Sequence, residues 1–172
     1  LITCGFTFGF EVEKIEAKEI ESINVSSTKI RNAITTGDIH KANQYLNRPF
    51  RITGKVVTGN RIGRKIDFPT ANISITEDFK LLPKDGVYFV KSLIKSHYFF
   101  GMMNIGFRPT VNGKARTTEV HYFNFNENLY DKKVKIEVLD LIRNEKKFNS
   151  LEDLEKQLVI DKKLCEDLIQ KL

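Results

Sequence analysis

Cysteine and long apolar runs are scarce in this sequence, and each shortage excludes a class of protein. The two cysteines, Cys4 and Cys165, lie at opposite ends of the chain without a C-x-x-C spacing, which argues against a disulfide framework and a zinc site. No stretch approaches the ~20 apolar residues of a membrane-spanning helix, and the first residues lack the features of a signal peptide. We therefore expect a reduced, cytoplasmic protein without a membrane partner.

Familiar catalytic signatures are also missing. The chain contains no G-x-x-x-x-G-K-[ST] phosphate loop, no G-x-G-x-x-G dinucleotide fingerprint and no G-x-S-x-G nucleophile motif. The spacings of His40, His97 and His121 do not suit a metal-ligand set with the two cysteines. We expect all three to be ordinary core or surface histidines.

The length of the chain allows one domain and a fragment of another, and its net positive charge makes an anionic partner plausible. The 172 residues are 41% hydrophobic and 29% charged, the balance of a globular protein that buries a core. Lys and Arg number 28 against 22 Asp and Glu, for a net charge of +6. Nucleic acid, nucleotide phosphates and acidic lipids all stay open as partners. The first residues read as the middle of a strand, and we expect them to be the remainder of a larger protein.

Helical patterns occur at both ends of the chain. Ser26 and the two hydroxyl residues after it offer capping groups for a first helix, and a Gly-Asp pair ends it and caps a second, Ile39–Asn47. Near the C-terminus, Ser150 begins a helix with apolar residues at helical spacing. Asp161 is predicted to cap a last helix, Lys162–Leu172.

Between these ends, apolar and polar residues alternate with a period of two, which is typical of β-strands. Gly, Pro, Asn and Asp separate the runs. Five or six strands without intervening helices indicate an antiparallel barrel rather than a parallel α/β sheet. The runs begin at Phe50 and continue at Val87–Lys95, Tyr98–Asn104, Thr118–Phe125 and Val134–Ile142.

The densest polar cluster is the segment Gly59–Asn72. Gly59 and Gly63 allow the backbone to come close to a ligand, and nearby cations favour a polyphosphate. These cations are Arg61, Arg64 and Lys65. On composition alone, a basic hairpin loop is the simpler interpretation.

Thr70 and Asn72 offer a hydroxyl and an amide oxygen two residues apart, directly after Pro69. In an extended segment both side chains face the same side, where they could bind Mg²⁺ beside phosphate oxygens while Pro69 stiffens the approach. The alternative is a turn in which both side chains bond to nearby backbone groups.

Glu119 is the candidate general base. Alternation places it on one strand face with His121, and an enclosed carboxylate there could accept a proton. Val120 and Tyr122 make the other face equally credible as the core. Periodicity therefore leaves the orientation of Glu119 open.

Four ordered groups of residues resemble the riboflavin kinase family, over about 125 residues from Asn47 to the C-terminus. The groups are Gly59-x-x-x-Gly63-Arg64 with Phe68-Pro69-Thr70-Ala71-Asn72; Asn104-Ile105-Gly106-x-Arg108-Pro109-Thr110; Thr118-Glu119-Val120-His121; and Arg143-x-Glu145-x-Lys147-Phe148 followed by Ser150-Leu151-Glu152.

The resemblance implies a mainly β fold, a six-stranded antiparallel Greek-key barrel with a C-terminal helix. It implies transfer of the ATP γ-phosphoryl group to the 5'-hydroxyl of riboflavin, which gives FMN. Thr70 and Asn72 would bind Mg²⁺, or another divalent cation, and ATP phosphates. The Gly59–Lys65 loop would cover the nucleotide, and Glu119 would be the base. Arg143 and Phe148 would line the flavin end, and Asn124 and Tyr130 the adenosine side.

The chain departs from the family pattern at two glycines. Asp67 stands where the family has Gly, so either a position that tolerates positive φ is lost or Asp67 adopts that conformation itself. Asp131 replaces a second Gly, after the Asn126–Leu129 turn. These changes concern the adenosine contacts more than the kinase core.

The segment Ser26–Arg31 resembles the end of the nucleotidyltransferase domain in bifunctional riboflavin kinase and FAD synthetase. We therefore predict that residues 1–46 are an incomplete α/β nucleotidyltransferase domain, with mostly helical remnants, and that residues 47–172 are the kinase domain. The H-x-G-H motif of that domain is absent, and Phe6–Gly9 resembles its later F-x-F-G element with Gly5 at the acidic position. Adenylylation of FMN by these residues alone is not expected.

Two other functions stay open from the residues. Thirteen Phe and five Tyr on a basic barrel would also suit binding of single-stranded nucleic acid. A module that binds flavin nucleotide without catalysis is the other alternative. The motifs favour small-molecule substrates, ATP and riboflavin, without a nucleic acid partner.

Overall fold

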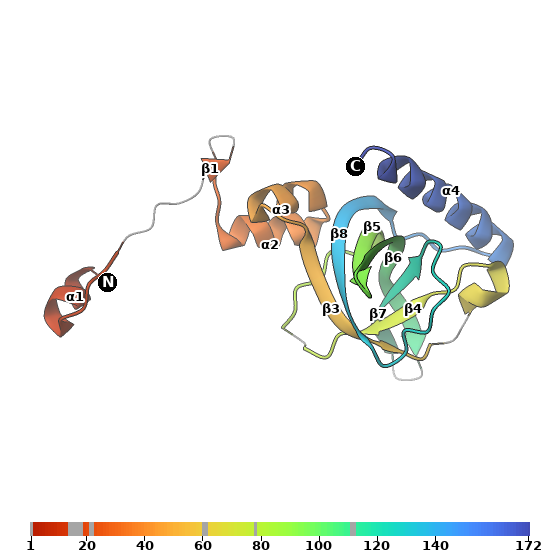
Figure 1. Ribbon diagram of the computed structural model, residues 1–172, viewed down its shortest axis with the longest axis horizontal. Helices are drawn as coiled ribbons and strands as arrows, with labels where there is room; N and C mark the ends of the chain where they lie inside the picture. Colours follow the sequence, from red (N-terminus) through yellow and green to blue (C-terminus); the bar gives the residue numbers. More distant parts are fainter. Residues whose placement is uncertain (1, 14–18, 21–22, 60–61, 78, 111–112) are drawn as a thin grey trace.

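The computed structural model describes residues 2–13, 19–20, 23–59, 62–77, 79–110 and 113–172, and its main feature is a closed barrel of six strands (Figure 1). Neighbouring strands are all antiparallel, in the order β3-β4-β7-β6-β5-β8, so no edge is left unpaired. The strands are β3 (Phe50–Val57), β4 (Ala71–Ser74), β5 (Gly86–Ile94), β6 (His97–Thr110), β7 (Gly113–Tyr122) and β8 (Lys133–Asn144).

The strand order confirms the Greek-key barrel. β5, β6 and β7 follow one another in sequence and in space, and β8 then returns to pair with β5 on its other side. That arrangement of four strands is a Greek key. β3 closes the barrel because it pairs with β4 along one edge and with β8 along the other.

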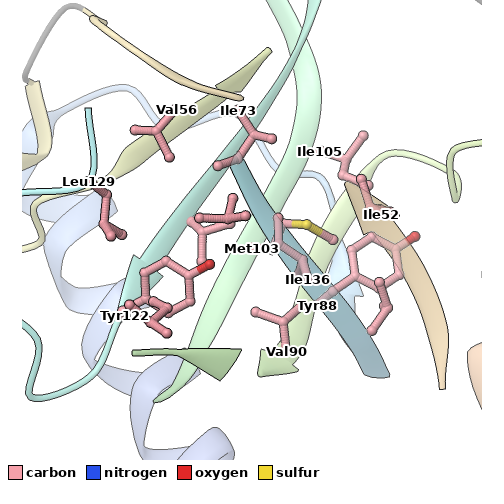
Figure 2. Packing of buried hydrophobic residues seen from close by; sticks show 14 of the residues in the cluster. Ile52, Val56, Ile73, Tyr88, Val90, Met103, Ile105, Tyr122, Leu129 and Ile136 are labelled. Carbon is pink, nitrogen blue, oxygen red and sulfur yellow. The ribbon is translucent and has the colours of Figure 1, made fainter. Parts of the chain in front are cut away.

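Apolar side chains form two layers, one inside the barrel and one outside it. Tyr88, Met103 and Ile136 meet in the interior, where each is fully buried (Figure 2). A second cluster lies between the outer face of the barrel and α4 (Leu151–Ile169), and it includes Phe89 and Cys165. Strands such as β5 are therefore covered on both faces and carry apolar residues at successive positions.

Two short helices pack at one end of the barrel. α2 (Ser27–Thr36) begins after the N-cap Ser26 and ends at Gly37, whose φ of 83° suits a helix C-cap. α3 (Ile39–Leu46) is joined to the barrel by the Asn43 side chain, which donates to the Val138 carbonyl at 3.0 Å and accepts from the Phe50 amide at 2.7 Å.

The remaining elements lie before α2 and between β3 and β4. They are α1 (Ile2–Phe8), the strand pair β1 (Glu19–Ile20) and β2 (Ile23–Asn24), and a 3₁₀ helix, η1 (Ile62–Ile66). None of the helices that the structure describes is long and apolar enough to cross a membrane.

The structure corrects the helix predictions at both ends. Residues 2–8 form a helix rather than part of a strand. Phe6 and Phe8 are exposed, so their side chains do not pack against a sheet. The two predicted C-terminal helices are one, because the sequence from Leu151 to Ile169 contains no Gly or Pro to interrupt it. Asp161 is therefore a buried residue within α4 and not a cap.

The two-layer packing predicts different reactivity for the two cysteines. Cys165 is fully buried, and burial raises its pKa to about 12, with further contributions from Asp161 and Glu166. Cys4 is exposed. Because the thiolate is the reactive form, we expect Ellman's reagent at pH 8 to modify only Cys4 in the folded protein and both thiols in urea. Rapid reaction of both thiols without urea would contradict the burial of Cys165.

Candidate functional site

Two cavities meet at Thr70, just before β4. The first, called here the loop cavity, has a volume of about 310 Å³ and lies beside the Asn126–Tyr130 loop. The second, called the helix cavity, has a volume of about 260 Å³ and lies between β7 and α4. Thr70 lines both, so a group bound in one cavity comes next to a group bound in the other at this residue.

The segment before Thr70 is folded tightly on itself. The Phe68 amide donates to the Gly63 carbonyl at 2.8 Å, and a Cβ on Gly63 would lie 2.1 Å from the Phe68 carbonyl oxygen. Gly63 is thus required by the close approach of two backbone segments. Asp67 has a φ of 56°, so it adopts the left-handed conformation expected of the family's glycine.

Glu119 lies beside Thr70 on the neighbouring strand. The Thr70 hydroxyl donates to a Glu119 carboxylate oxygen at 2.9 Å. Asn72 is the register partner of Glu119 across the β4–β7 pair, so their side chains lie on the same face. Gly59 packs against this group, because a Cβ there would lie 2.1 Å from the Asn72 amide nitrogen.

The face of β7 that carries Glu119 is the outer one. Val120 and Tyr122 belong to the barrel interior, whereas His121 and Phe123 lie among the residues that α4 covers. Glu119 therefore does not point into the barrel core. Its carboxylate lines the helix cavity instead.

His121 is buried next to Glu119 on this outer face. Its ring nitrogen Nδ1 lies 2.8 Å from the Pro69 carbonyl oxygen, and its ring lies 5.1 Å from that of Phe68. Burial lowers the pKa of His121 and the nearby Lys162 acts in the same direction, while the bond to Pro69 raises it. The ring is thus held in its neutral form against the turn that carries Thr70.

Arg143 is held at the other side of the helix cavity by α4. Its Nε donates to both carboxylate oxygens of Asp161, at 3.0 and 2.9 Å, and Gln157 donates to the same carboxylate at 2.9 Å. The guanidinium lies 5.7 Å from the centre of the Phe148 ring. Asp161 has no exposed surface, so this ion pair fixes both the guanidinium plane and the position of α4.

The loop cavity is bounded by the turn after β7. The Asn128 side chain accepts a hydrogen bond from the Tyr130 amide at 2.8 Å, and an Arg64 nitrogen lies 3.5 Å from the Tyr130 hydroxyl. Asp131 has a φ of 64° and pairs with Lys55 at 2.7 Å. Both aspartates that replace family glycines thus adopt left-handed conformations.

Most of the predicted site residues lie together. Those that line a cavity are Gly63, Arg64, Pro69, Thr70, Glu119, Tyr130, Arg143 and Phe148. Among the described residues, four others line neither cavity, namely Gly59, Lys65, Asn72 and Asn124. Arg61 lies outside the described residues.

The donors near Thr70 suit a hard cation better than a soft one. Within the described parts of the chain, no group of three or more His, Cys, Asp or Glu side chains is placed to hold a metal ion. Thr70, Asn72 and Glu119 instead offer hydroxyl, amide and carboxylate oxygens from the paired strands β4 and β7 and the residue just before β4. A cation with few protein ligands, completed by phosphate oxygens and water, is the kind that such a set fits.

A comparison with protein families matches residues 46–169 to the riboflavin kinase model. The chain belongs to the riboflavin kinase family. Among curated relatives, the bifunctional riboflavin kinase/FMN adenylyltransferase of Haemophilus influenzae is 43% identical over 155 residues, which cover 90% of this chain and 50% of that protein. The Escherichia coli K12 protein of the same name is 35% identical, with 91% and 50% covered. The chain thus spans about half the length of these relatives.

Solved structures agree with the riboflavin kinase fold. Riboflavin kinase from Trypanosoma brucei aligns with a TM-score of 0.50 and 29% identity, over 72% of this chain and 81% of that one. A Streptococcus pneumoniae structure described as a macrolide-efflux protein aligns with a TM-score of 0.84 and 35% identity, over 95% of this chain and 53% of that one. The family match, and not that description, decides the assignment of this chain.

Sequence reasoning missed the structural role of one residue of this riboflavin kinase domain. Asp161 was interpreted as a helix cap, although its separation of four from Gln157 is the spacing of helix neighbours that can bond. The signal for Asp161 was helical periodicity, but its partner Arg143 is 18 residues away in sequence. His121 is a core histidine, as the sequence predicts, and its partner Pro69 is 52 residues away.

The buried ion pair predicts that Asp161 matters for stability. Asp161→Asn leaves the Arg143 guanidinium, whose side chain is only 19% exposed, without its carboxylate. We expect the free energy of unfolding in urea to fall by about 1 to 3 kcal/mol. The matched control on the same helix is Glu166→Gln, which removes the exposed 3.8 Å pair with Lys162 and should change stability by less than about 0.5 kcal/mol. Equal effects of the two changes would contradict the role of the pair.

Proposed function

We propose that this domain transfers the γ-phosphoryl group of ATP to the 5'-hydroxyl of riboflavin, which yields FMN and ADP. The observation that carries the proposal is the hydrogen bond between Thr70 and Glu119 at the junction of the two cavities. A phosphate donor on one side and a hydroxyl acceptor on the other would meet there. Family membership supports the same reaction.

The helix cavity suits the flavin ring. Its walls include apolar side chains from β5, β6 and α4, together with the Phe148 ring and the flat Arg143 guanidinium. A planar, mostly apolar ring with polar edges would find stacking surfaces and charged groups there. The ribityl chain would then extend toward Glu119.

The loop cavity suits the nucleotide. Tyr130 and Arg64 of η1 line it together with Thr70. The cations of this segment would attract the phosphates, as proposed for Arg61, Arg64 and Lys65, while Gly59 and Gly63 keep the loop close. Asn124 lies two residues before the Asn126–Tyr130 loop, where it would contact the adenosine side.

At the junction, the ribityl oxygen attacks the γ-phosphorus, the bond to the β-phosphate oxygen breaks, and ADP leaves. Glu119 accepts the proton of the hydroxyl as the new oxygen–phosphorus bond forms. Its bond from Thr70 orients the carboxylate. Mg²⁺, or another divalent cation, held by Thr70 and Asn72 would neutralise phosphate charge. Apart from this proton transfer and charge neutralisation, catalysis would require the two substrates to be positioned, and the two cavities would do this.

We further propose that residues 1–46 are part of an FMN adenylyltransferase domain and that residues 47–172 are the kinase domain. The curated relatives carry both names and are about twice as long as this chain. α2 and α3 would belong to the first domain, although Asn43 of α3 is bonded to the barrel. The parent protein would work on soluble flavins in the cytoplasm.

Incubation of the chain with riboflavin, ATP and Mg²⁺ tests the reaction. We expect FMN and ADP in equal amounts by chromatography, with no product when the divalent cation is chelated. A folded protein that retains FMN but transfers no phosphate would indicate a non-catalytic flavin module. Binding of an oligonucleotide that weakens with salt, with no effect of flavin or ATP, would support the nucleic acid alternative.

Glu119→Gln tests the general base. The amide keeps the size and can still bond to Thr70, but it cannot accept the proton, so we expect kcat to fall by about a hundredfold or more. The dissociation constant of riboflavin, measured by its fluorescence, should change less than about threefold. Glu155→Gln, on the exposed face of α4, is the control. Parallel losses of binding and turnover in Glu119→Gln would show a structural role instead.

A further inference from the structure

The backbone pairing between β4 and β7 stops just where Thr70 is needed. Ala71 pairs with Val120 and Asn72 with Glu119, and β4 begins at Ala71. Pro69 has no N–H, so it cannot donate to the ladder, and its carbonyl still needs a donor. The turn that carries Thr70 therefore depends on side chains for its attachment to β7.

Two alternate residues of β7 supply that attachment. Glu119 accepts from the Thr70 hydroxyl at 2.9 Å, and His121 Nδ1 lies 2.8 Å from the Pro69 carbonyl oxygen. A carbonyl oxygen only accepts, so the proton of this bond is on Nδ1 of His121. Consecutive residues of the turn are thus bonded to one face of one strand.

The His121 ring is itself held in place. It lies between Phe68, with ring centres 5.1 Å apart, and Phe123, with ring centres 5.8 Å apart. Phe68 and Phe123 both belong to the buried cluster beneath α4. The orientation of Nδ1 is therefore set by packing before any ligand binds.

We infer that His121 is a positioning residue for phosphoryl transfer, which acts through the Pro69 carbonyl to hold the Thr70 hydroxyl at the junction of the two cavities. The inference rests on the proposed kinase function. His121 also lines the helix cavity, so its ring shape and its hydrogen bond must be separated by experiment.

Asparagine and glutamine make that separation possible. The Nδ2 of Asn is placed like the Nδ1 of His, whereas the Nε2 of Gln is placed like the Nε2 of His. His121→Asn can keep the bond to Pro69, and His121→Gln cannot keep it in the same place. Both changes remove the ring, so any effect of ring shape on flavin binding is common to both.

The test measures kcat, the KM for riboflavin and the Mg²⁺ concentration for half-maximal activity in both variants. We expect His121→Gln to lower kcat about three- to tenfold below His121→Asn, which is the effect of one hydrogen bond, and to need more Mg²⁺. The KM for riboflavin should rise equally in both. Equal kcat in the two variants would overturn the inference.

A measurement on the unmodified protein keeps the inference testable if a variant fails to fold. The ¹⁵N chemical shifts of the His121 ring, assigned by comparison with His40→Gln and His97→Gln proteins, should show a neutral ring protonated on Nδ1. Protonation on Nε2 alone would overturn the inference. Failure of the proposed function is distinguishable, because it would appear as absence of FMN production by the unmodified protein.

Discussion

The constraint on which this structure depends is that the end of β7, residues 120–122, is buried on both faces. The inner side chains, Val120 and Tyr122, pack in the barrel interior, while His121, and Phe123 just after the strand, lie beneath α4. A polar side chain on the outer face must therefore have a partner or border a cavity. Glu119 does both, since it bonds to Thr70 and lines the helix cavity.

α4 is held against the outer face of the barrel by a buried ion pair as well as by apolar contacts. Asp161 is fully buried and accepts from Arg143 and Gln157. A buried carboxylate is costly unless its bonds are satisfied, and satisfied bonds fix geometry more than they add stability. The pair sets the register of α4 over the barrel, and with it the wall of the helix cavity.

Two aspartates near the site adopt backbone conformations that usually require glycine. Asp67 and Asp131 have φ angles of 56° and 64°, a region that costs most residues roughly 1 to 2 kcal/mol but suits Asp and Asn better. Asp67 turns the chain between η1 and the buried Phe68. Both aspartates thus adopt the left-handed conformation that a glycine would tolerate.

The sequence by itself determined the class of fold, the positions of most strands and the set of residues that gather around Thr70. Alternation with a period of two and ordered motifs are local signals, and they predicted the barrel correctly. Errors came where a local pattern had two meanings. Asp161 has the chemistry of a helix cap, but α4 continues through it.

The family resemblance implied that Glu119 faces the ligand, but only the tertiary structure shows that this face of β7 lies beneath α4 and that Thr70 joins two cavities. Periodicity could not choose a face because Val120 and Tyr122 on one face and His121 on the other are all buried. The partners of Glu119, His121 and Arg143 are 49, 52 and 18 residues away in sequence. Such contacts depend on barrel closure and on the docking of α4, which no short stretch of sequence encodes.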